Sequence, residues 1–305
     1  MPELPEVQTT VKGLNSKVLL RTFIDVWSDW KKIIKKPGRN FPLRSKLSQP
    51  EKDFEIFKKE IKGKKIKKVW RRAKNVIFDL SDDYSLLIHQ KMTGHLMVGE
   101  WKIENNKWKP IKKGPLEEKI NTFLHLIFFL DNGKMVALSD VRKFAKAELW
   151  KTKDLLNSKE FKSIGPEPLE KDFTFKKFEE LFKNKKGKIK QVLMNPEIIA
   201  GIGNIYSNEA LWWAKIHPQK DVARLSKKEL KLLYHSIKKV LSAGIKLGGE
   251  SFSDYRNIDG KKGHFDDERK VYKKEKEKCA RCKTTIARVK FGGRSAFFCP
   301  KCQKL

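Results

Sequence analysis

The sequence predicts an α+β protein built from several domains. Apolar runs of strand character fill residues 75–139, helical periodicity dominates after residue 165, and two C-x2-C pairs close the chain. A chain of 305 residues has room for two domains and a small appendage. We expect a β-rich domain over residues 1–150, a linker over 151–168, a helical domain over 169–270 and a cysteine-bearing tail over 271–305.

The charge of the chain indicates what kind of partner it binds. Sixty-nine Lys and Arg residues against 37 Asp and Glu residues give a net charge of +32. Such an excess favours a polyanion, bound through phosphate contacts and counterion release. A ribosomal, membrane-surface or thermophile-like lysine-rich protein would also be strongly basic. No stretch approaches the roughly 20 apolar residues of a membrane span, and the first twenty residues lack a signal-peptide pattern. We therefore expect a cytoplasmic protein.

The first predicted element is a helix just after the N-terminus. Val7, Val11, Leu14 and Val18 recur at i, i+4, i+7 and i+11, which places them on one helical face. The opening "MPELPEV" suits a helix start, because proline fits the first turn and glutamate favours the positive end of the helix dipole. This structural interpretation explains the two prolines and two glutamates as a helix start and assigns them no catalytic role.

The same opening also permits a catalytic interpretation. We expect Met1 to be removed ahead of the small Pro2, which frees a secondary amine. A terminal amine has a pKa near about 7.7–8.0, so more of it is neutral at pH 7 than of a lysine. Such an amine can attack the anomeric carbon of a sugar, expel the base and leave an iminium Schiff base. Glu3 can donate a proton to the opening sugar ring, and Glu6 can hold the amine.

The strands are predicted from apolar runs that follow this helix. They are "NVIFDL", "YSLLIHQ" and "NTFLHLIFFLDNGKMVAL". Asn132-Gly133, between two apolar runs, predicts a β-hairpin. Residues 31–75 are rich in lysine and show no clear pattern. The segment from Glu100 to Lys119 is predicted to be a polar surface excursion.

Helices are predicted for the residues that follow the Pro/Gly-containing stretch at 165–173. Ser226 and Glu229 form a capping box ahead of a long apolar periodicity, and Gly248-Gly249 ends that helix. A further helix is expected from Ile205, directly after Gly201-x-Gly203-Asn204. Free N–H groups at its start suit a phosphate, with Asn204 capping the helix or binding the phosphate. A plain junction between two helices would look the same.

The tail predicts a structural zinc site. Two C-x2-C pairs separated by sixteen residues can direct four thiolates at one tetrahedral Zn²⁺, and no fifth ligand is in view. The ligands are Cys279, Cys282, Cys299 and Cys302. A redox pair is the alternative. Gly292-Gly293 suits a hairpin tip between the pairs, where Arg294 is either a phosphate contact or solvated charge.

Taken together, these motifs resemble the formamidopyrimidine-DNA glycosylase family, the bacterial enzymes that excise oxidised purines. The matching stretches, in family order, are "MPELPEV", "RRAKNVIFDL", "HQKMTGHL", "DVRKF", "GPEPL", "IKQVLMNPEIIAGIGNIYSNEALW", "GGESFSDY" and the cysteine tail. The resemblance covers nearly the whole chain. It is interrupted at about residues 28–65 and 100–120.

The resemblance implies a fold and an activity. The fold would be an N-terminal β-sandwich with flanking helices, a helix–two-turns–helix module and a C-terminal zinc ribbon. The activity would be that of a bifunctional DNA glycosylase/AP lyase that removes 8-oxoguanine and formamidopyrimidines by β,δ-elimination. The resemblance also implies one structural zinc ion and no redox or nucleotide cofactor. It implies a monomer whose partner is duplex DNA that contains oxidised bases or abasic sites.

The resemblance also assigns roles to residues. Pro2 would be the nucleophile, Glu3 the acid, Glu6 its catalytic neighbour, Lys74 a phosphate contact and proton donor, and Arg294 the residue serving δ-elimination. The DNA-binding residues would be His89, Met92, Arg142, Phe144, Lys185, Lys190 and Asn204. Met92, Arg142 and Phe144 would fill the gap left by the flipped nucleotide.

Several positions depart from the family pattern, among them "KKGHF" in place of the more usual "KPGYF". Phe123 stands where a DNA-contacting histidine is usual, and Val141 and Lys143 replace a proline and an arginine beside the gap-filling loop. Ser253 replaces a lysine in the loop that forms the base pocket of relatives, at about residues 251–263. These departures leave the ranking of lesions and opposite bases open. Two other classes compete with an enzyme: a damage-binding protein that has lost the chemistry, and a basic zinc-ribbon RNA-binding or ribosomal protein.

Overall fold

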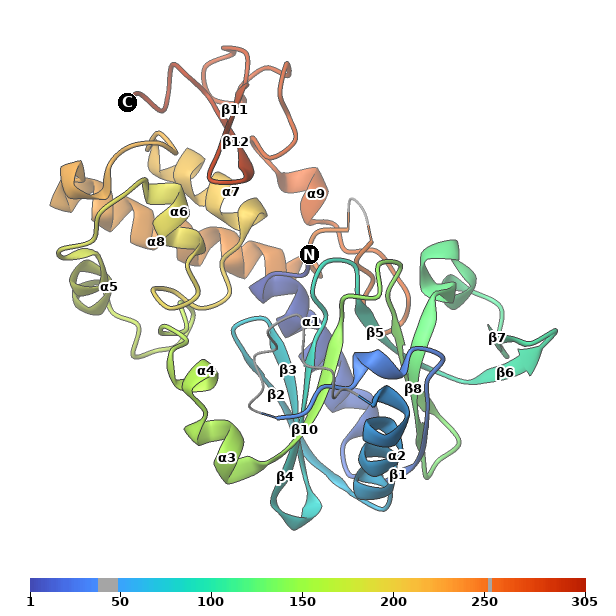
Figure 1. Cartoon of the computed structure of the whole chain (residues 1–305). Helices are drawn as coiled ribbons and strands as arrows, with labels where there is room; N and C mark the ends of the chain where they lie inside the picture. Colours follow the sequence, from blue (N-terminus) through green and yellow to red (C-terminus); the bar gives the residue numbers. More distant parts are fainter. Residues whose placement is uncertain (38–48, 252–253) are drawn as a thin grey trace. The chain divides into compact units, whose positions relative to one another are not determined.

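A computed structural model describes residues 1–37, 49–251 and 254–305 (Figure 1), so the departure at Ser253 lies outside the described residues. Contacts divide the chain into two compact units. The first comprises residues 1–2, 6–162 and 248–263, and the second comprises residues 3–5, 163–247 and 264–305. Both units therefore include residues from the first helix and from the stretch that follows residue 247. The division of the sequence into four ranges stays a prediction.

The first unit contains a β-sandwich of two four-stranded antiparallel sheets. The first sheet has the order β1 (Phe23–Trp27), β8 (Leu124–Leu130), β9 (Met135–Ser139) and β5 (His95–Gly99). The second has the order β10 (Lys146–Lys151), β4 (Tyr84–His89), β3 (Asn75–Leu80) and β2 (Ile66–Arg72). The turn between β8 and β9 carries Asn132-Gly133, which confirms the predicted hairpin.

The core of the first unit lies between these sheets and two helices. Phe23 of β1 contacts both Phe128 of β8, at 5.2 Å between ring centroids, and Phe78 of β3, at 6.3 Å. Helix α1 (Leu4–Val18) and helix α2 (Pro50–Ile61) bury their apolar faces in the same core, and all four valine and leucine positions predicted for α1 are buried there. Two short helices, α3 (Thr152–Asn157) and α4 (Lys159–Lys162), follow β10. The predicted sandwich with flanking helices is confirmed.

The segment Glu100–Lys119 is a largely exposed excursion, as predicted, but it also contains structure that the sequence did not reveal. The segment forms the hairpin β6 (Trp101–Glu104) and β7 (Lys107–Pro110), and the Trp101 side chain is buried. Trp108 packs on Trp27 at 5.4 Å and on Phe129 at 5.9 Å between ring centroids. Because the outer face of the first sheet is apolar, it needs a cover, and the tryptophans of the hairpin provide one. The intervening lysines concealed this pattern in the sequence.

The second unit is built from helices around one apolar core. They are α5 (Phe175–Phe182), α6 (Ile189–Met194), α7 (Asn204–Ala214), α8 (Lys227–Lys246) and α9 (Phe265–Glu268). The predicted capping box is present, since the Ser226 hydroxyl accepts a bond from the Glu229 amide at 3.2 Å and the Glu229 carboxylate accepts one from the Ser226 amide at 3.0 Å. Among the described residues, every helix is too short or too polar to cross a bilayer.

A two-stranded ribbon completes the second unit. Strands β11 (Ala287–Phe291) and β12 (Arg294–Phe298) are joined by Gly292 and Gly293, which have φ of +55° and +69°. Two positive φ angles are what a tight two-residue hairpin turn requires, so the predicted tip is confirmed. The buried Glu209 of α7 accepts bonds from the amides of residues 270–272 at 2.8–3.0 Å. Burial raises the pKa of Glu209, and these bonds connect the segment that leads to the ribbon to α7.

Candidate functional site

The first turn of α1 is fixed in the first unit by residues distant in sequence. Glu6 is 1% exposed, and its Oε1 accepts a bond from the Glu250 amide at 2.8 Å. The Tyr255 hydroxyl donates to the Glu6 carbonyl at 2.9 Å, and burial raises the pKa of Tyr255, so the phenol keeps its proton. Pro2 is buried in the same unit. Sequence reasoning missed Glu250 and Tyr255, which only the match of "GGESFSDY" to the family hinted at.

Glu3 belongs to the second unit, where it holds the start of α7. Its carboxylate accepts bonds from the amides of Gly203 at 2.8 Å, Ile205 at 2.8 Å and Tyr206 at 3.3 Å. These three amides are therefore taken by Glu3 and are not free for a phosphate, while a DNA-binding role of Asn204 stays a prediction. The amides and the positive end of the helix dipole attract an anion, and Glu3 of the same chain supplies it. Asn204 does not cap the helix, because the N-cap position is Gly203.

Lys190 and Asn204 lie together in the second unit. Lys190, on α6, is 1% exposed, and its Nζ donates to Asn204 Oδ1 at 2.6 Å and to the Ser295 carbonyl at 2.5 Å. Burial lowers the pKa of Lys190 to about 7, with Glu3 opposing the shift and Arg294 adding to it. A buried ammonium thus connects α6, the start of α7 and the ribbon.

The lowered pKa of Lys190 predicts a pH dependence of stability. An unfolded lysine keeps a pKa near 10.5, so between about pH 7 and pH 10 the unfolded state binds more protons than the folded state. Stability therefore rises with pH through this window, and acidification through it is destabilising. We expect Lys190→Met to remove this contribution to the slope. Urea unfolding of both proteins across the window measures it, and parallel slopes would contradict the assignment.

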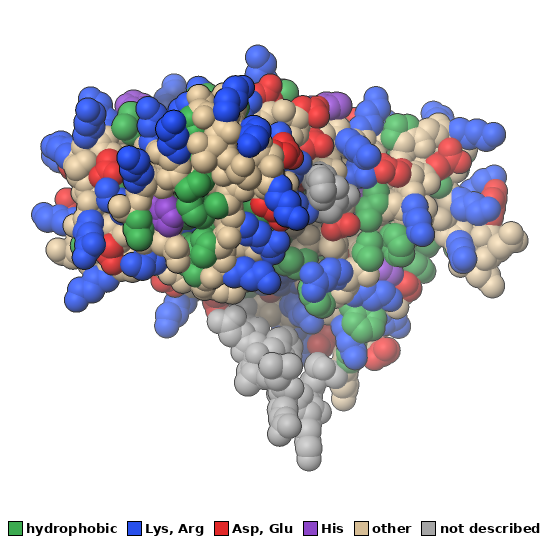
Figure 2. All heavy atoms as spheres, turned by 90° about the horizontal axis from the view of Figure 1, so that it is seen from above, with side chains coloured by type: hydrophobic (Ala, Val, Ile, Leu, Met, Phe, Trp, Pro, Cys, Tyr) green, Lys and Arg blue, Asp and Glu red, His purple; other side chains and the backbone are tan. Residues whose placement is uncertain are grey.

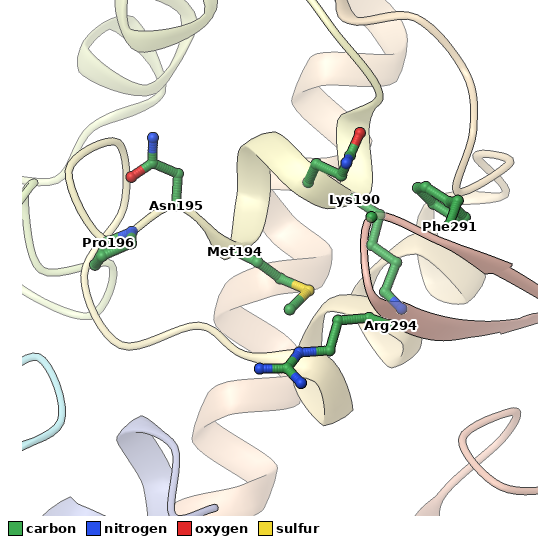
Figure 3. Close-up of a pocket in the computed structure, with 8 residues that line it drawn as sticks. Lys190, Met194, Asn195, Pro196, Phe291 and Arg294 are labelled. Atoms are coloured by element: carbon green, nitrogen blue, oxygen red, sulfur yellow. The ribbon is translucent and has the colours of Figure 1, made fainter. Parts of the chain in front are cut away.

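Arg294 lies at the ribbon tip, next to a pocket of about 320 Å³. Figure 3 shows Arg294 of β12 beside Lys190 of α6, with Met194, Asn195 and Pro196 along the other side. The Arg294 side chain is exposed, whereas Lys190 is buried. Gly292 approaches Gln191 of α6 so closely that a Cβ there would collide with its amide. The ribbon tip is thereby set against α6 with its arginine accessible.

Lys74 lies in a tight hairpin turn of the first unit. Strands β2 and β3 pair up to Arg72 and Asn75, so Ala73 and Lys74 make the turn. Arg71 donates from Nε to Gln8 Oε1 of α1 at 3.0 Å and from Nη1 to the Ala73 carbonyl at 3.0 Å. The turn that carries Lys74 is thus tied to the helix that carries Glu6.

His89 ends strand β4 as a neutral side chain. Burial, with the neighbouring charges of Lys91, Lys146 and Lys74, lowers the pKa of His89 to about 3. Its Nδ1 accepts a bond from the Lys91 amide at 2.9 Å. The proton of the neutral ring therefore sits on Nε2, which makes this atom a hydrogen-bond donor suited to a phosphate oxygen.

Two loops of the first unit bring together the residues predicted to fill a gap in DNA. The Thr93 hydroxyl, next to Met92, donates to the buried Asp140 carboxylate. Asp140 also accepts from the Phe144 amide at 2.7 Å and the Ala145 amide at 2.8 Å. The Arg142 guanidinium stacks over the Phe144 ring at 4.6 Å, and Phe144 is 52% exposed. An exposed ring on a fixed loop is suited to insertion between bases.

Asp140 was missed by sequence reasoning, although an aspartate followed by a short polar turn is a signal for side-chain capping. We expect Asp140→Ala to lower the free energy of unfolding by about 1–3 kcal/mol, because it leaves the loop amides without their acceptor. Urea unfolding measures the change. The exposed Asp131→Ala serves as control and should change stability by less than about 0.5 kcal/mol. Equal effects of the two substitutions would contradict the role of Asp140.

Lys185 lies apart from these groups. It is exposed on the loop between α5 and α6, among other lysines. Figure 2 shows Lys and Arg side chains across the face in view, interspersed with fewer acidic groups. The predicted positive charge is thus spread over the surface, where phosphate contacts need it.

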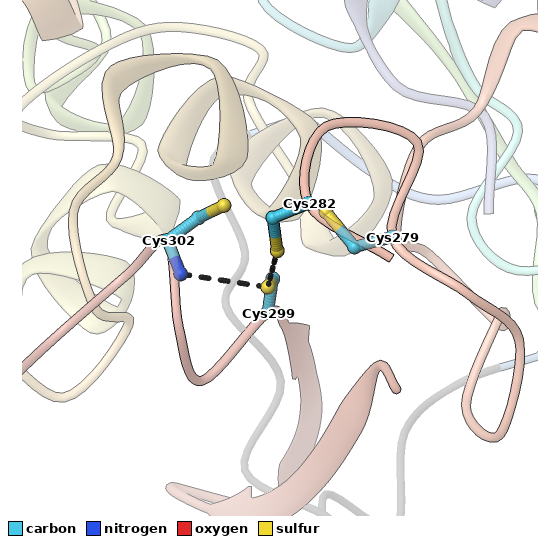
Figure 4. Close-up of side chains that lie close together, drawn as sticks. All are labelled: Cys279, Cys282, Cys299 and Cys302. Carbon is cyan, nitrogen blue, oxygen red and sulfur yellow. Dashed lines mark hydrogen bonds between the residues drawn. The ribbon is translucent and has the colours of Figure 1, made fainter. Parts of the chain in front are cut away.

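The four cysteines form a site that fits zinc. Their Sγ atoms all lie within 4.8 Å of one another, as Figure 4 shows for the two knuckles facing each other. Sulfur atoms around a tetrahedral zinc with Zn–S bonds of about 2.3 Å lie about 3.8 Å apart, so little movement is needed. All four are free thiols rather than disulfides. The predicted zinc site is confirmed, because the four predicted cysteines lie together at distances that one zinc ion can bridge.

The sandwich, the glutamate-capped helix module and the four-cysteine ribbon define a DNA-repair class of protein, and comparison with known sequences agrees. Residues 1–147 match the model of the formamidopyrimidine-DNA glycosylase N-terminal domain, residues 164–256 its H2TH domain, and residues 276–305 the zinc finger found in FPG and IleRS. The chain belongs to the formamidopyrimidine-DNA glycosylase family. The resemblance inferred from the sequence is confirmed, as is the helix–two-turns–helix module.

Individual relatives support this membership over the full chain. Formamidopyrimidine-DNA glycosylases of Desulforamulus reducens and Lactococcus lactis subsp. cremoris are 34% and 35% identical to it, over 100% of this chain and 99% and 100% of theirs. The structure of Lactococcus lactis Fpg with DNA containing an abasic site has a TM-score of 0.83, 34% identity, and coverage of 99% of this chain and 100% of that one. MutM bound to DNA containing carbocyclic 8-oxo-G has a TM-score of 0.81, 34% identity and full coverage of both chains.

Proposed function

We propose that this protein is a bifunctional DNA glycosylase/AP lyase that excises oxidised purines, 8-oxoguanine and formamidopyrimidines, from duplex DNA. The observation that carries the proposal is the buried Glu3 carboxylate, which three backbone amides hold one residue after Pro2. A helix start can be capped by a neighbouring side chain and does not need a glutamate from 200 positions away. An acid fixed directly beside a potential amine nucleophile serves glycosidic chemistry.

The proposed reaction begins when Met1 has been removed. The neutral Pro2 nitrogen attacks C1′ of the damaged nucleotide, the bond from C1′ to the base breaks, and the departing base takes up the proton that the alkylated Pro2 nitrogen releases. Glu3 protonates the ring oxygen, the sugar opens, and a C1′ iminium forms. The iminium accepts electrons when the C2′ proton is lost, so the 3′ phosphate leaves, and a second elimination releases the 5′ phosphate. Water then hydrolyses the link and frees Pro2.

The other residues hold DNA in this proposal. Lys74 contacts phosphate and donates a proton during β-elimination, and Arg294 serves δ-elimination from a ribbon tip that zinc stiffens. The remaining DNA-binding residues would be His89, Met92, Arg142, Phe144, Lys185, Lys190 and Asn204. Lys190 would act through its bond to Asn204 rather than by direct contact, since it is buried. We further propose that the protein acts as a monomer in the cytoplasm, on the nucleoid.

Borohydride trapping tests the proposal. Borohydride reduces an iminium to a stable bond, so wild-type protein should become covalently linked to a duplex with one 8-oxoguanine opposite cytosine. Pro2→Gly is the control, and intact mass should show that mature wild-type protein begins at Pro2. An adduct on a plain abasic site alone would mean that the chemistry is right and the lesion wrong. No adduct on either duplex, with Met1 absent, would favour a damage-binding protein without chemistry.

A further inference from the structure

Residues 254–263 belong to the first unit, although residues up to 247 and from 264 onward belong to the second. One side of this segment is attached to α1, through the Tyr255 bond to the Glu6 carbonyl. The Ile258 carbonyl accepts a bond from the Val98 amide of β5 at 2.8 Å. The Ile258 side chain also covers Gly13 of α1 so closely that a Cβ there would lie 2.6 Å from it. The segment is therefore docked along its length.

The excursion that interrupts the family resemblance holds the other side of the segment. Its last turns, η3 (Pro115–Glu117) and η4 (Lys119–Thr122), flank Glu118. Glu118 accepts two bonds from Arg256, at 2.6 Å from Nε and 2.5 Å from Nη2. The Arg256 side chain is only 4% exposed, and its guanidinium holds the pKa of Glu118 below the usual range. Because a buried guanidinium is costly without a partner, Glu118 fixes where Arg256 lies.

A second contact, from Asn121 just after the excursion, fixes the segment four residues later. Asn121 is fully buried, and its Nδ2 donates to the Gly260 carbonyl at 3.1 Å and to the Pro115 carbonyl at 2.7 Å. Its Oδ1 pairs with Nε2 of the buried His95 at 2.8 Å. Gly260 has φ of +75°, and a Cβ there would lie 2.7 Å from Asn121. Glu118 of the excursion and Asn121 just after it thus fix positions 256 and 260 at once.

The segment borders the place where a damaged base must lie, if the proposed function holds. Attack requires the Pro2 nitrogen to come within about 3–3.5 Å of C1′, and the base is bonded to that same carbon. Glu6, which Tyr255 contacts, lies in the first turn of α1, only four residues after Pro2. A base on C1′ is therefore within reach of residues 255–260. An abasic sugar brings no base and needs no wall for one.

We infer that Glu118 is a positioning residue, which, together with Asn121, holds residues 255–260 as a preformed wall for the damaged base. The lysine-rich excursion then contributes to base recognition, besides covering the sheet. The inference rests on the proposed function. It predicts that Glu118 matters for base excision and not for strand cleavage at an abasic site.

The test compares Glu118→Gln with Glu104→Gln in the zinc-loaded full chain. Both substitutions remove one negative charge from the same excursion, but Glu104 forms its ion pairs with Lys102 and Lys109 at the exposed hairpin. Single-turnover rates are measured on a duplex with 8-oxoguanine and on one with a preformed abasic site. Hydrogen exchange of the Val98 amide, which bonds the Ile258 carbonyl, reports docking of the segment.

Glu118→Gln should slow base excision by about tenfold, the order expected for loss of a charged hydrogen-bonded pair. It should also speed exchange at Val98 and leave abasic-site cleavage within about twofold of wild type. Glu104→Gln should change none of these. Equal slowing on both duplexes, or unchanged excision, would overturn the inference. If wild-type protein cleaved neither duplex, the proposed function itself would fail, and the exchange result would still show whether Glu118 docks the segment.

Discussion

Replacing Glu3 with glutamine should reduce excision of 8-oxoguanine by about 10²–10⁴-fold, the usual contribution of a positioned general acid. Glutamine has nearly the same shape, and its amide oxygen can still accept from an α7 amide, but it cannot donate a proton as an acid does. An abasic sugar already opens to an aldehyde in water, so Pro2 can condense with it unaided. Schiff-base formation on abasic DNA should therefore persist in Glu3→Gln.

Single-turnover excision and borohydride trapping measure the two halves of this prediction on the same preparation. Thermal unfolding is the control, because the substitution also disturbs the bonds to Gly203 and Tyr206. Loss of trapping on abasic DNA in a folded variant would show that Glu3 acts on the nucleophile rather than on the sugar ring. Full excision activity would exclude Glu3 as the acid.

Removing one zinc ligand should have the second large effect. Cys299 is fully buried, and Cys299→Ala leaves three thiolates for the metal. Since structural zinc contributes roughly 10–16 kcal/mol to the folding of zinc-finger peptides, the ribbon should lose both metal and structure. Arg294 would then no longer be held against α6. We expect zinc content to fall from one ion per chain towards zero and lesion-DNA affinity to fall at least about tenfold.

Lys301→Ala is the matched control for this variant. Lys301 lies between Cys299 and Cys302 and is exposed, so its loss should leave the zinc content unchanged. Elemental analysis of purified protein and a binding titration at fixed salt measure both quantities. A Cys299→Ala protein that kept one zinc and wild-type affinity would contradict the assigned site.

The elements best predicted from sequence were those set by local rules. The apolar period of α1, the Asn132-Gly133 turn, the Ser226 capping box and the cysteine spacing each depend on residues close in the chain. Their physical causes are helix geometry, turn conformation and metal coordination, which a short stretch of sequence already contains.

The site was less predictable, because its contacts join residues far apart in the chain. Glu3 bonds Gly203 and Tyr255 bonds Glu6, across some 200 and 249 positions, and neither stretch carries a local signal of its distant partner. The start of α7 was predicted to bind a phosphate because its amides have no partner in the local sequence. The partner they have in the structure, the Glu3 carboxylate, is about 200 positions away. The excursion lies at the surface as predicted, but its hairpin and the tryptophans that anchor it were not predicted, since its lysines outnumber them.

The glutamate at the start of α7 has a consequence for interpreting sequence variants. A Cβ at Gly203 would lie 2.5 Å from Glu3 Oε1, so there is no room for even a methyl group. A substitution of Gly203 by alanine would displace the carboxylate without altering any residue that takes part in the chemistry. In a mutation screen, cells that carry this alanine substitution would behave like cells that lack Glu3, although the substitution lies 200 positions away and adds no polar atom.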